Sequence, residues 1–219
     1  MKNKQDSIIE IEPFIRNDQY NFIKFQINNL VHAHSIVTDK DVLTALKLSS
    51  LDKIMTLFLD ISENQKSILK KVIENEKEIH PEVLLTELKN DVLPFKSVTE
   101  KTISKLFPKV KKWKAPSLEI DFREWSYLGW YDIRSKKKLL IVDDNGKLMG
   151  IQGTFTGNIK GICSLCNAHE EVGLFMSNVK TGKETYTNRG NYICIDSYKC
   201  NQNLMTLEKL ISFVELFKN

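Results

Sequence analysis

Four cysteines are the residues of this chain best suited to chemistry, because thiolates are soft ligands for metal ions. They form two close pairs, Cys163 with Cys166 and Cys194 with Cys200, and 27 residues separate the pairs. A tetrahedral Zn²⁺ takes four such ligands, and each short pair supplies one edge of the tetrahedron. The spacing therefore predicts a structural zinc site made by Cys163, Cys166, Cys194 and Cys200.

Two disulfides or four free thiols are the alternatives to zinc. The N-terminal residues carry charge and lack the long apolar stretch of a secretion signal, so we expect a cytoplasmic protein. In that reducing compartment, paired thiols more often hold a metal than bond to each other. A catalytic zinc fits less well, since it leaves one position open for water and four thiolates can fill all of them. His169 follows Cys166 closely but is expected to be a surface residue.

Motifs of the common enzyme classes are missing from the sequence. There is no GxxxxGK[ST] phosphate loop, no HExxH helix and no GxSxG nucleophile elbow. The PCxxC motif of zinc deaminases is also absent. We therefore expect a protein that works by binding and is not an enzyme.

Composition indicates an ordinary globular protein. The chain has 219 residues, 42% of them hydrophobic and 27% charged, which is long enough for two modest cores. No apolar run approaches the roughly twenty residues that a membrane-spanning helix needs. The formal net charge of +4 is smaller than a dedicated nucleic-acid binder usually carries, so charge alone does not choose a partner.

The chain changes character near residue 80. Residues 1–80 contain no glycine, and their apolar residues recur at helical spacing, which predicts three or four helices packed as a small bundle. Pro13 fits the first turn of the first helix, while Asp39 and Ser62 fit the N-caps of later helices. The predicted fold class is α+β, with this bundle followed by an α/β domain over residues 81–219.

The second domain is predicted to contain an antiparallel sheet. Helices are expected from Pro81 to about Val92 and from Val98 to Leu106. Strand-like stretches follow, and Asp144-Asn-Gly146 is a tight-turn signal between two of them.

A second hairpin is predicted between the cysteine pairs, from 171–176 and 185–187. Helical spacing returns from Leu204 to Phe217, with Leu204, Leu207, Ile211 and Val214 on one face. A cysteine knuckle, a hairpin and a helix that share one zinc ion describe a treble-clef-like finger over residues 155–219.

Several motifs together resemble one family. They are Phe107-Pro-Lys-Val-Lys-Lys, Ser126-Tyr-Leu-Gly-Trp130, Gly161-Ile-Cys-Ser-Leu-Cys166, Gly190-Asn-Tyr-Ile-Cys-Ile-Asp-Ser197 and Cys200-Asn201. In this order they are similar to the elongation factor G-binding proteins that confer fusidic acid resistance. The resemblance spans residues 107–201 by motif, and the helical front half agrees in size and character.

This resemblance implies a two-domain protein that binds elongation factor G. Fusidic acid traps the factor on the ribosome after GTP hydrolysis. Proteins of the family promote its release and so protect the target, without modifying or pumping the drug. The resemblance also assigns zinc to the four cysteines and places the factor-binding surface on the C-terminal domain. We expect a monomer.

Four residues are candidates for that surface. Lys183 and Tyr186 lie in the glycine-bearing loop between the cysteine pairs, Phe155 ends a predicted strand, and Phe213 lies off the apolar face of the last predicted helix. An aromatic ring beside a lysine is typical of interface hot spots, and the ammonium suits an acidic partner. The alternative is that Phe155 and Phe213 complete the small core of the finger.

A zinc-finger RNA-binding module associated with the ribosome is the main alternative function. The basic runs Lys109–Lys114 and Arg134–Lys138 could follow a phosphate backbone, with Trp113 available for base stacking. Such runs are more often solvated faces of a protein.

Overall fold

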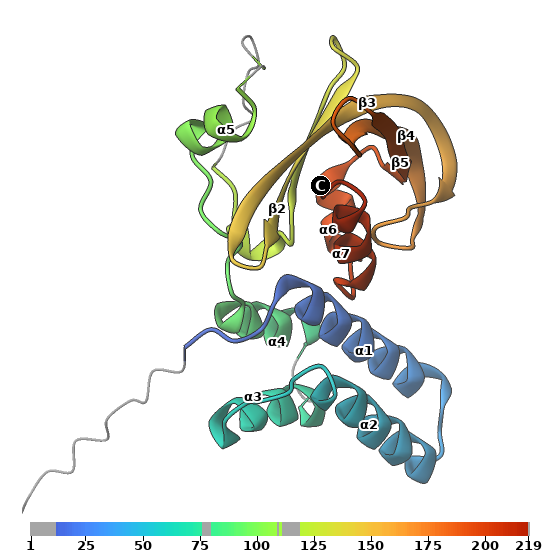
Figure 1. Cartoon of the computed structure of the whole chain (residues 1–219). Coiled ribbons are helices and arrows are strands. Elements are labelled where there is room, and N and C mark those ends of the chain that lie inside the picture. Colours follow the sequence, from blue (N-terminus) through green and yellow to red (C-terminus); the bar gives the residue numbers. More distant parts are fainter. Residues whose placement is uncertain (1–11, 76–79, 109, 111–118, 219) are drawn as a thin grey trace, which may run out of the picture. The chain divides into compact units, whose positions relative to one another are not determined.

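The computed structural model describes residues 12–75, 80–108, 110 and 119–218 (Figure 1). The chain divides into two compact units. One contains Phe22–Leu93 together with the chain up to Ile15, and the other contains Arg16–Asn21 and Pro94–Asn219. The N-terminal part is helical and the C-terminal part holds a sheet with further helices, which confirms the predicted α+β class.

The first unit is built from helices that the predicted caps help to start. The helices are α1 (Asn17–Ile36), which counts in this unit from Phe22 on, α2 (Lys40–Met55), α3 (Glu63–Glu74) and α4 (Pro81–Leu88), and the 3-10 turn η1 (Lys89–Asp91) follows. Asp39 accepts hydrogen bonds from two backbone N–H groups at the start of α2. Ser62 and Gln65 form a capping box at the start of α3. Both caps confirm the prediction.

The start of α1 differs from the expected one. Pro13 was expected in its first turn, but α1 begins at Asn17. The residues before it are extended because Ile15 forms a parallel bridge with Val92, and its carbonyl accepts a hydrogen bond from the N–H of Leu93 at 2.8 Å. The prediction for Pro13 is therefore wrong.

Helix α4 belongs to the first unit, whereas the sequence analysis placed it in the second domain. The helix buries Leu84, Leu85 and Leu88, and the chain just after it pairs with Ile15. The compact units consequently divide between Leu93 and Pro94, beyond the expected boundary at residue 80.

The second unit contains a five-stranded antiparallel sheet in which spatial order follows chain order. Helix α5 (Glu100–Leu106) and the 3-10 turn η2 (Phe122–Glu124) precede it. The strands are β1 (Leu128–Asp132), β2 (Lys137–Asp144), β3 (Lys147–Ile162), β4 (His169–Lys180) and β5 (Tyr186–Cys194). Helices α6 (Ser197–Asn203) and α7 (Glu208–Glu215) follow, and β3 to β5 curve around them (Figure 1).

Strand β2 has both of its faces covered. Leu140 and Val142 share one core with residues of α6 and α7, whereas Leu139 and Ile141 share another with residues of α5. This follows from the two-residue period of a strand. The tight turn between β2 and β3 lies where it was predicted, with Asn145 and Gly146 at positive φ angles of 49° and 87°.

The last helix is shorter than predicted. It was expected from Leu204 to Phe217, but α7 begins only at Glu208 and ends at Glu215, and Leu204 is extended just after the end of α6. The buried residues of α7 are Leu210, Phe213 and Val214. Ile211, which was assigned to the buried face, is 55% exposed.

Candidate metal centre

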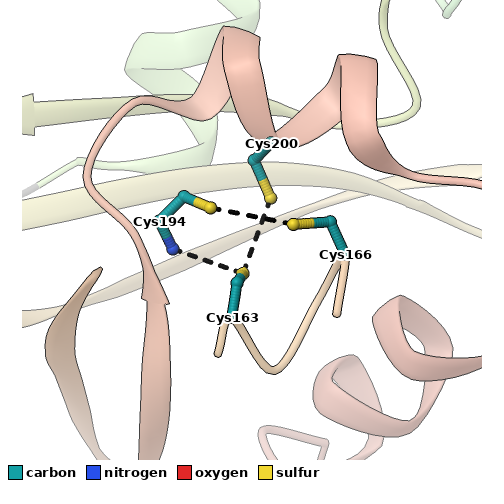
Figure 2. Close-up of side chains that lie close together, drawn as sticks. All are labelled: Cys163, Cys166, Cys194 and Cys200. Atoms are coloured by element: carbon teal, nitrogen blue, oxygen red, sulfur yellow. Dashed lines mark hydrogen bonds between the residues drawn. The ribbon is translucent and has the colours of Figure 1, made fainter. Parts of the chain in front are cut away.

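The sheet and α6 bring the four cysteines together (Figure 2). Cys163 and Cys166 lie in the tight connection between β3 and β4, Cys194 ends β5, and Cys200 lies in α6. Asn167, at a φ angle of 61°, turns the connection, and its N–H donates to the carbonyl of Cys163 at 2.9 Å. The knuckle therefore points both of its thiols toward those of the other pair (Figure 2).

The distances between sulfur atoms fit a tetrahedral metal ion. All four Sγ atoms lie within 4.8 Å of one another. The Sγ atoms of Cys163 and Cys200 are 3.8 Å apart, and those of Cys166 and Cys194 are 3.7 Å apart. Zinc–sulfur bonds of about 2.3 Å give a tetrahedron with edges of about 3.8 Å. A disulfide needs about 2.05 Å, so the cysteines are free thiols placed to hold a metal ion, for which zinc stays our prediction.

The electrostatics of the cluster also favour a cation. Cys163 Sγ accepts hydrogen bonds from the backbone N–H groups of Leu165 at 3.4 Å and Cys194 at 3.3 Å. Hydrogen bonds from the neighbouring thiols lower the pKa of Cys163. Their own hydrogen bonds to Cys163 raise the pKa values of Cys194 and Cys200, and burial and repulsion by the charge of Cys163 add to this effect. A bound dication would offset that repulsion and allow all four sulfurs to ionise.

Tyr127 supplies a buried hydroxyl beside this cluster. Its side chain is fully buried, and its oxygen has no conventional hydrogen-bond partner. Burial raises the pKa of Tyr127 well above its ordinary value, and the charge of Cys200 adds to this effect. A protonated donor left over in the core is satisfied best by an anionic sulfur, which is a further reason to expect thiolates here.

Asn201, the residue after Cys200, ties α6 to the start of β1. Its Oδ1 accepts hydrogen bonds from the N–H groups of Ser126 at 2.7 Å and Tyr127 at 3.2 Å. Its Nδ2 donates to the carbonyls of Tyr127 at 3.0 Å and Ser197 at 2.8 Å. The side chain is fully buried, and three of these four bonds are buried as well, while the bond from Ser126 is partly buried.

Asn201→Ala is therefore expected to lower the free energy of unfolding by at least about 3 kcal/mol, because it leaves several buried backbone groups unpaired. Urea denaturation of the metal-loaded protein measures this loss. Asn203→Ala is the matched control, since Asn203 makes one half-buried hydrogen bond, to Glu170 at 3.1 Å. Equal losses for the two variants would contradict the role given to Asn201.

The structure separates the four candidate partner-binding residues into two groups. Lys183 lies exposed in the loop between β4 and β5, and Tyr186 at the start of β5 is 64% exposed. Phe155 is fully buried and Phe213 is 3% exposed, and both pack in the core beside the cysteines. Phe155 and Phe213 are thus withdrawn as contact residues, and the alternative interpretation of them as core holds. Phe213 was misplaced because the predicted apolar face was drawn from Leu204, which is not helical, and therefore differs from the buried face of α7.

Tyr186 lines a shallow groove on the second unit. The groove has a volume of about 250 Å³, and its walls include Met149, Val179 and Phe217. The loop beside it is held by a hydrogen bond from the N–H of Thr181 to the carbonyl of Thr185 at 2.9 Å. An exposed ring at the edge of a groove is well placed for a protein contact.

The structure describes only part of the two basic runs, and one of the described lysines is buried. Lys109, Lys111–Lys114 and with them Trp113 lie outside the described residues. In the second run Arg134 is exposed in the turn between β1 and β2, but Lys138 is completely buried. Burial lowers the pKa of Lys138 to about 8, while the charges of the cysteines act in the opposite direction. Lys138 therefore does not face solvent as a phosphate-binding residue would.

Tyr127, Lys138 and Asn201 surround the cysteines, and the sequence analysis did not select any of them as site residues. Tyr127 and Asn201 fall within the quoted family motifs, which was the one available signal. No sequence signal pointed to a role of Lys138 beside the cysteines, because a lysine that ends a basic run is usually exposed. His169 is exposed and is not part of the cysteine cluster. None of the described helices is long and apolar enough to cross a membrane.

Comparisons with known proteins agree over both halves of the chain. The family described as “Elongation factor G-binding protein, N-terminal” matches residues 14–96. A solved structure, described as “Structure of the fusidic acid resistance protein FusC”, is similar over 94% of this chain and 98% of that chain, with 32% sequence identity and a TM-score of 0.79. No curated protein matches the sequence.

Proposed function

Because the chain belongs to the family of elongation factor G-binding proteins, we propose that it binds elongation factor G and promotes the release of this factor from ribosomes stalled by fusidic acid. The observation that carries the proposal is the similarity to FusC, which extends over nearly the whole of both chains. The result for the cell would be fusidic acid resistance by protection of the drug's target.

The metal finger is proposed to act as a rigid platform for this interaction. The hairpin of β4 and β5 runs from the cysteine cluster at one end, where Val172 pairs with Cys194, to the exposed loop at the other, where Lys180 pairs with Tyr186. Fixing the cysteines therefore fixes the base of the hairpin that carries Lys183 and Tyr186. The aromatic ring offers contact area, and the lysine adds attraction to an acidic surface.

Release needs no covalent step in this proposal. If the protein binds a ribosome-free conformation of the factor more tightly than the trapped one, that difference in affinity shifts the population toward release. This agrees with the expectation that the protein is not an enzyme, which stays a proposal.

Calorimetric titration into purified elongation factor G tests the binding step. We expect tight binding by the wild-type protein and at least tenfold weaker binding by Tyr186→Ala, since hot-spot aromatics contribute about 2 kcal/mol or more. Tyr192→Ala is the matched control, because Tyr192 is an exposed tyrosine of the same strand, 42% exposed and about 20 Å farther along it. Absence of binding by the wild-type protein would refute the function. Unchanged binding by Tyr186→Ala would refute only the assignment of Tyr186 to the factor-binding surface.

An RNA-binding module remains the second candidate function. The exposed Arg134, Lys136 and Lys137 at the turn between β1 and β2 are the observation in its favour. Titration of ribosomal RNA at several salt concentrations distinguishes the two functions. Submicromolar affinity that falls steeply with salt would favour RNA as the partner.

A further inference from the structure

Lys138 is a fully buried lysine in the core that surrounds the cysteines. It lies on β2, and the two-residue period of the strand puts it on the same face as Leu140 and Val142. Those two residues pack in the cluster that includes Cys163, Cys194 and Cys200. The ammonium group is therefore directed toward the metal centre from within the sheet.

The contacts of this ammonium group concentrate on the second cysteine pair. Lys138 Nζ donates to the carbonyl of Cys194 at 2.9 Å and to that of Ile195 at 2.7 Å. It also lies 5.0 Å from the centre of the Phe155 ring, within the range of a cation–π contact. The Lys138 ammonium group thus holds the backbone carbonyl of Cys194, which ends β5, and that of the next residue, Ile195.

Within the described part of the chain, no ion pair joins Lys138 to a carboxylate. A buried charge without a counter-charge is strongly unfavourable. Four thiolates around a dication carry a net negative charge, and the cysteines are the main negative groups that act on Lys138, with a smaller attraction from Asp196. The positive charge of Lys138 and the negative charge of the metal-loaded centre therefore compensate each other.

We propose that Lys138 is a positioning residue of the metal centre. Its ammonium group fixes the Cys194 and Ile195 carbonyls, so that the Cys194 thiolate is aimed at the other three, and it offsets the negative charge of the loaded site. Groups that orient ligands and compensate charge in this way commonly change metal affinity 10- to 100-fold when they are removed.

Transfer of zinc from the loaded protein to a chromogenic chelator tests this role. Lys138→Met keeps the unbranched apolar part of the side chain but removes its charge and its donors, and we expect zinc to leave about ten times faster or more. Lys137→Met is the matched control, because Lys137 is the exposed neighbour on the same strand. A transfer rate for Lys138→Met equal to that of wild type would overturn the proposal.

Loss of ordinary core packing is separated by a second control. Leu139→Ala removes a side chain that is as well buried but lies on the opposite face of β2, in the other core. We expect this variant to unfold at lower urea concentration without faster zinc transfer from the folded protein. The cobalt-loaded forms add a spectroscopic readout, since their absorption should shift in Lys138→Met and not in Leu139→Ala. Equal zinc transfer rates and equal spectra for Lys138→Met and Leu139→Ala would show that Lys138 contributes only to core packing, and would overturn the proposal.

A measurement on the wild-type protein keeps the proposal testable if Lys138→Met does not fold. In zinc-loaded protein with ¹⁵N-labelled lysine, one ammonium signal should be protected from solvent exchange by its hydrogen bonds to the Cys194 and Ile195 carbonyls. Absence of any protected ammonium signal in the zinc-loaded form would show that Lys138 does not hold these carbonyls, and would overturn the proposal.

Discussion

Cys163→Ser is expected to unfold the finger and, with it, to abolish binding to elongation factor G. Cys163 is completely buried, and its sulfur accepts two backbone hydrogen bonds and lies 3.8 Å from that of Cys200. Structural zinc contributes on the order of 10 kcal/mol to the folding of small sites of this kind at neutral pH. That is comparable to the whole stability of a typical domain, so partial retention of structure around the cysteines is not expected.

Metal content, thermal unfolding and calorimetric binding measure the effect of Cys163→Ser together. Ser164→Ala is the matched control, because Ser164 lies in the same knuckle and its backbone N–H donates to the carbonyl of Tyr192, a bond that alanine keeps. Treatment of the wild-type protein with a strong chelator should reproduce the Cys163→Ser result. Tight factor binding by Cys163→Ser would show that the metal finger is not the platform.

Addition of the protein to ribosomes that carry elongation factor G trapped by fusidic acid is expected to accelerate dissociation of the factor at least tenfold. A tenfold faster rate requires that the protein stabilise the transition state for dissociation by about 1.4 kcal/mol more than it stabilises the trapped form, which a single hot-spot contact can supply. Tyr186→Ala should lose most of this acceleration, since Tyr186 is the exposed aromatic of the proposed surface.

Stopped-flow fluorescence of labelled factor on the stalled ribosome gives the dissociation rate directly. Tyr192→Ala again serves as the control for an exposed tyrosine outside the proposed surface. Tight binding to the free factor combined with an unchanged dissociation rate would separate binding from release and remove the proposed mechanism.

Local features of this protein were predictable from local sequence. The clustering of the four cysteines followed from their spacing, because a CxxC knuckle places its two thiols side by side wherever it occurs. The turn at Asn145 and Gly146 and the caps at Asp39 and Ser62 followed for the same reason, since each depends on the chemistry of a few adjacent residues.

Burial of individual aromatics was decided by packing between distant segments. Phe155 and Phe213 looked available for a partner, but α7 begins only at Glu208, and its phase turns Phe213 into the same core as Phe155. The expected helical face had assumed one continuous helix from Leu204. Leu204 is extended instead, so the buried face of α7 cannot be derived from it, and the sequence carried no strong signal for this late start.

The sequence by itself predicted the four cysteines that lie together, the α+β fold class and the family. Only the tertiary structure decided what surrounds the ligands: the Asn201 hydrogen bonds, the Tyr127 hydroxyl and the buried Lys138. Lys138 is separated from Cys194 by 56 positions in the chain and meets it across the sheet. Ligand spacing is a local property, whereas the environment of a metal centre depends on which strands and helices pack against it, and spacing does not encode that.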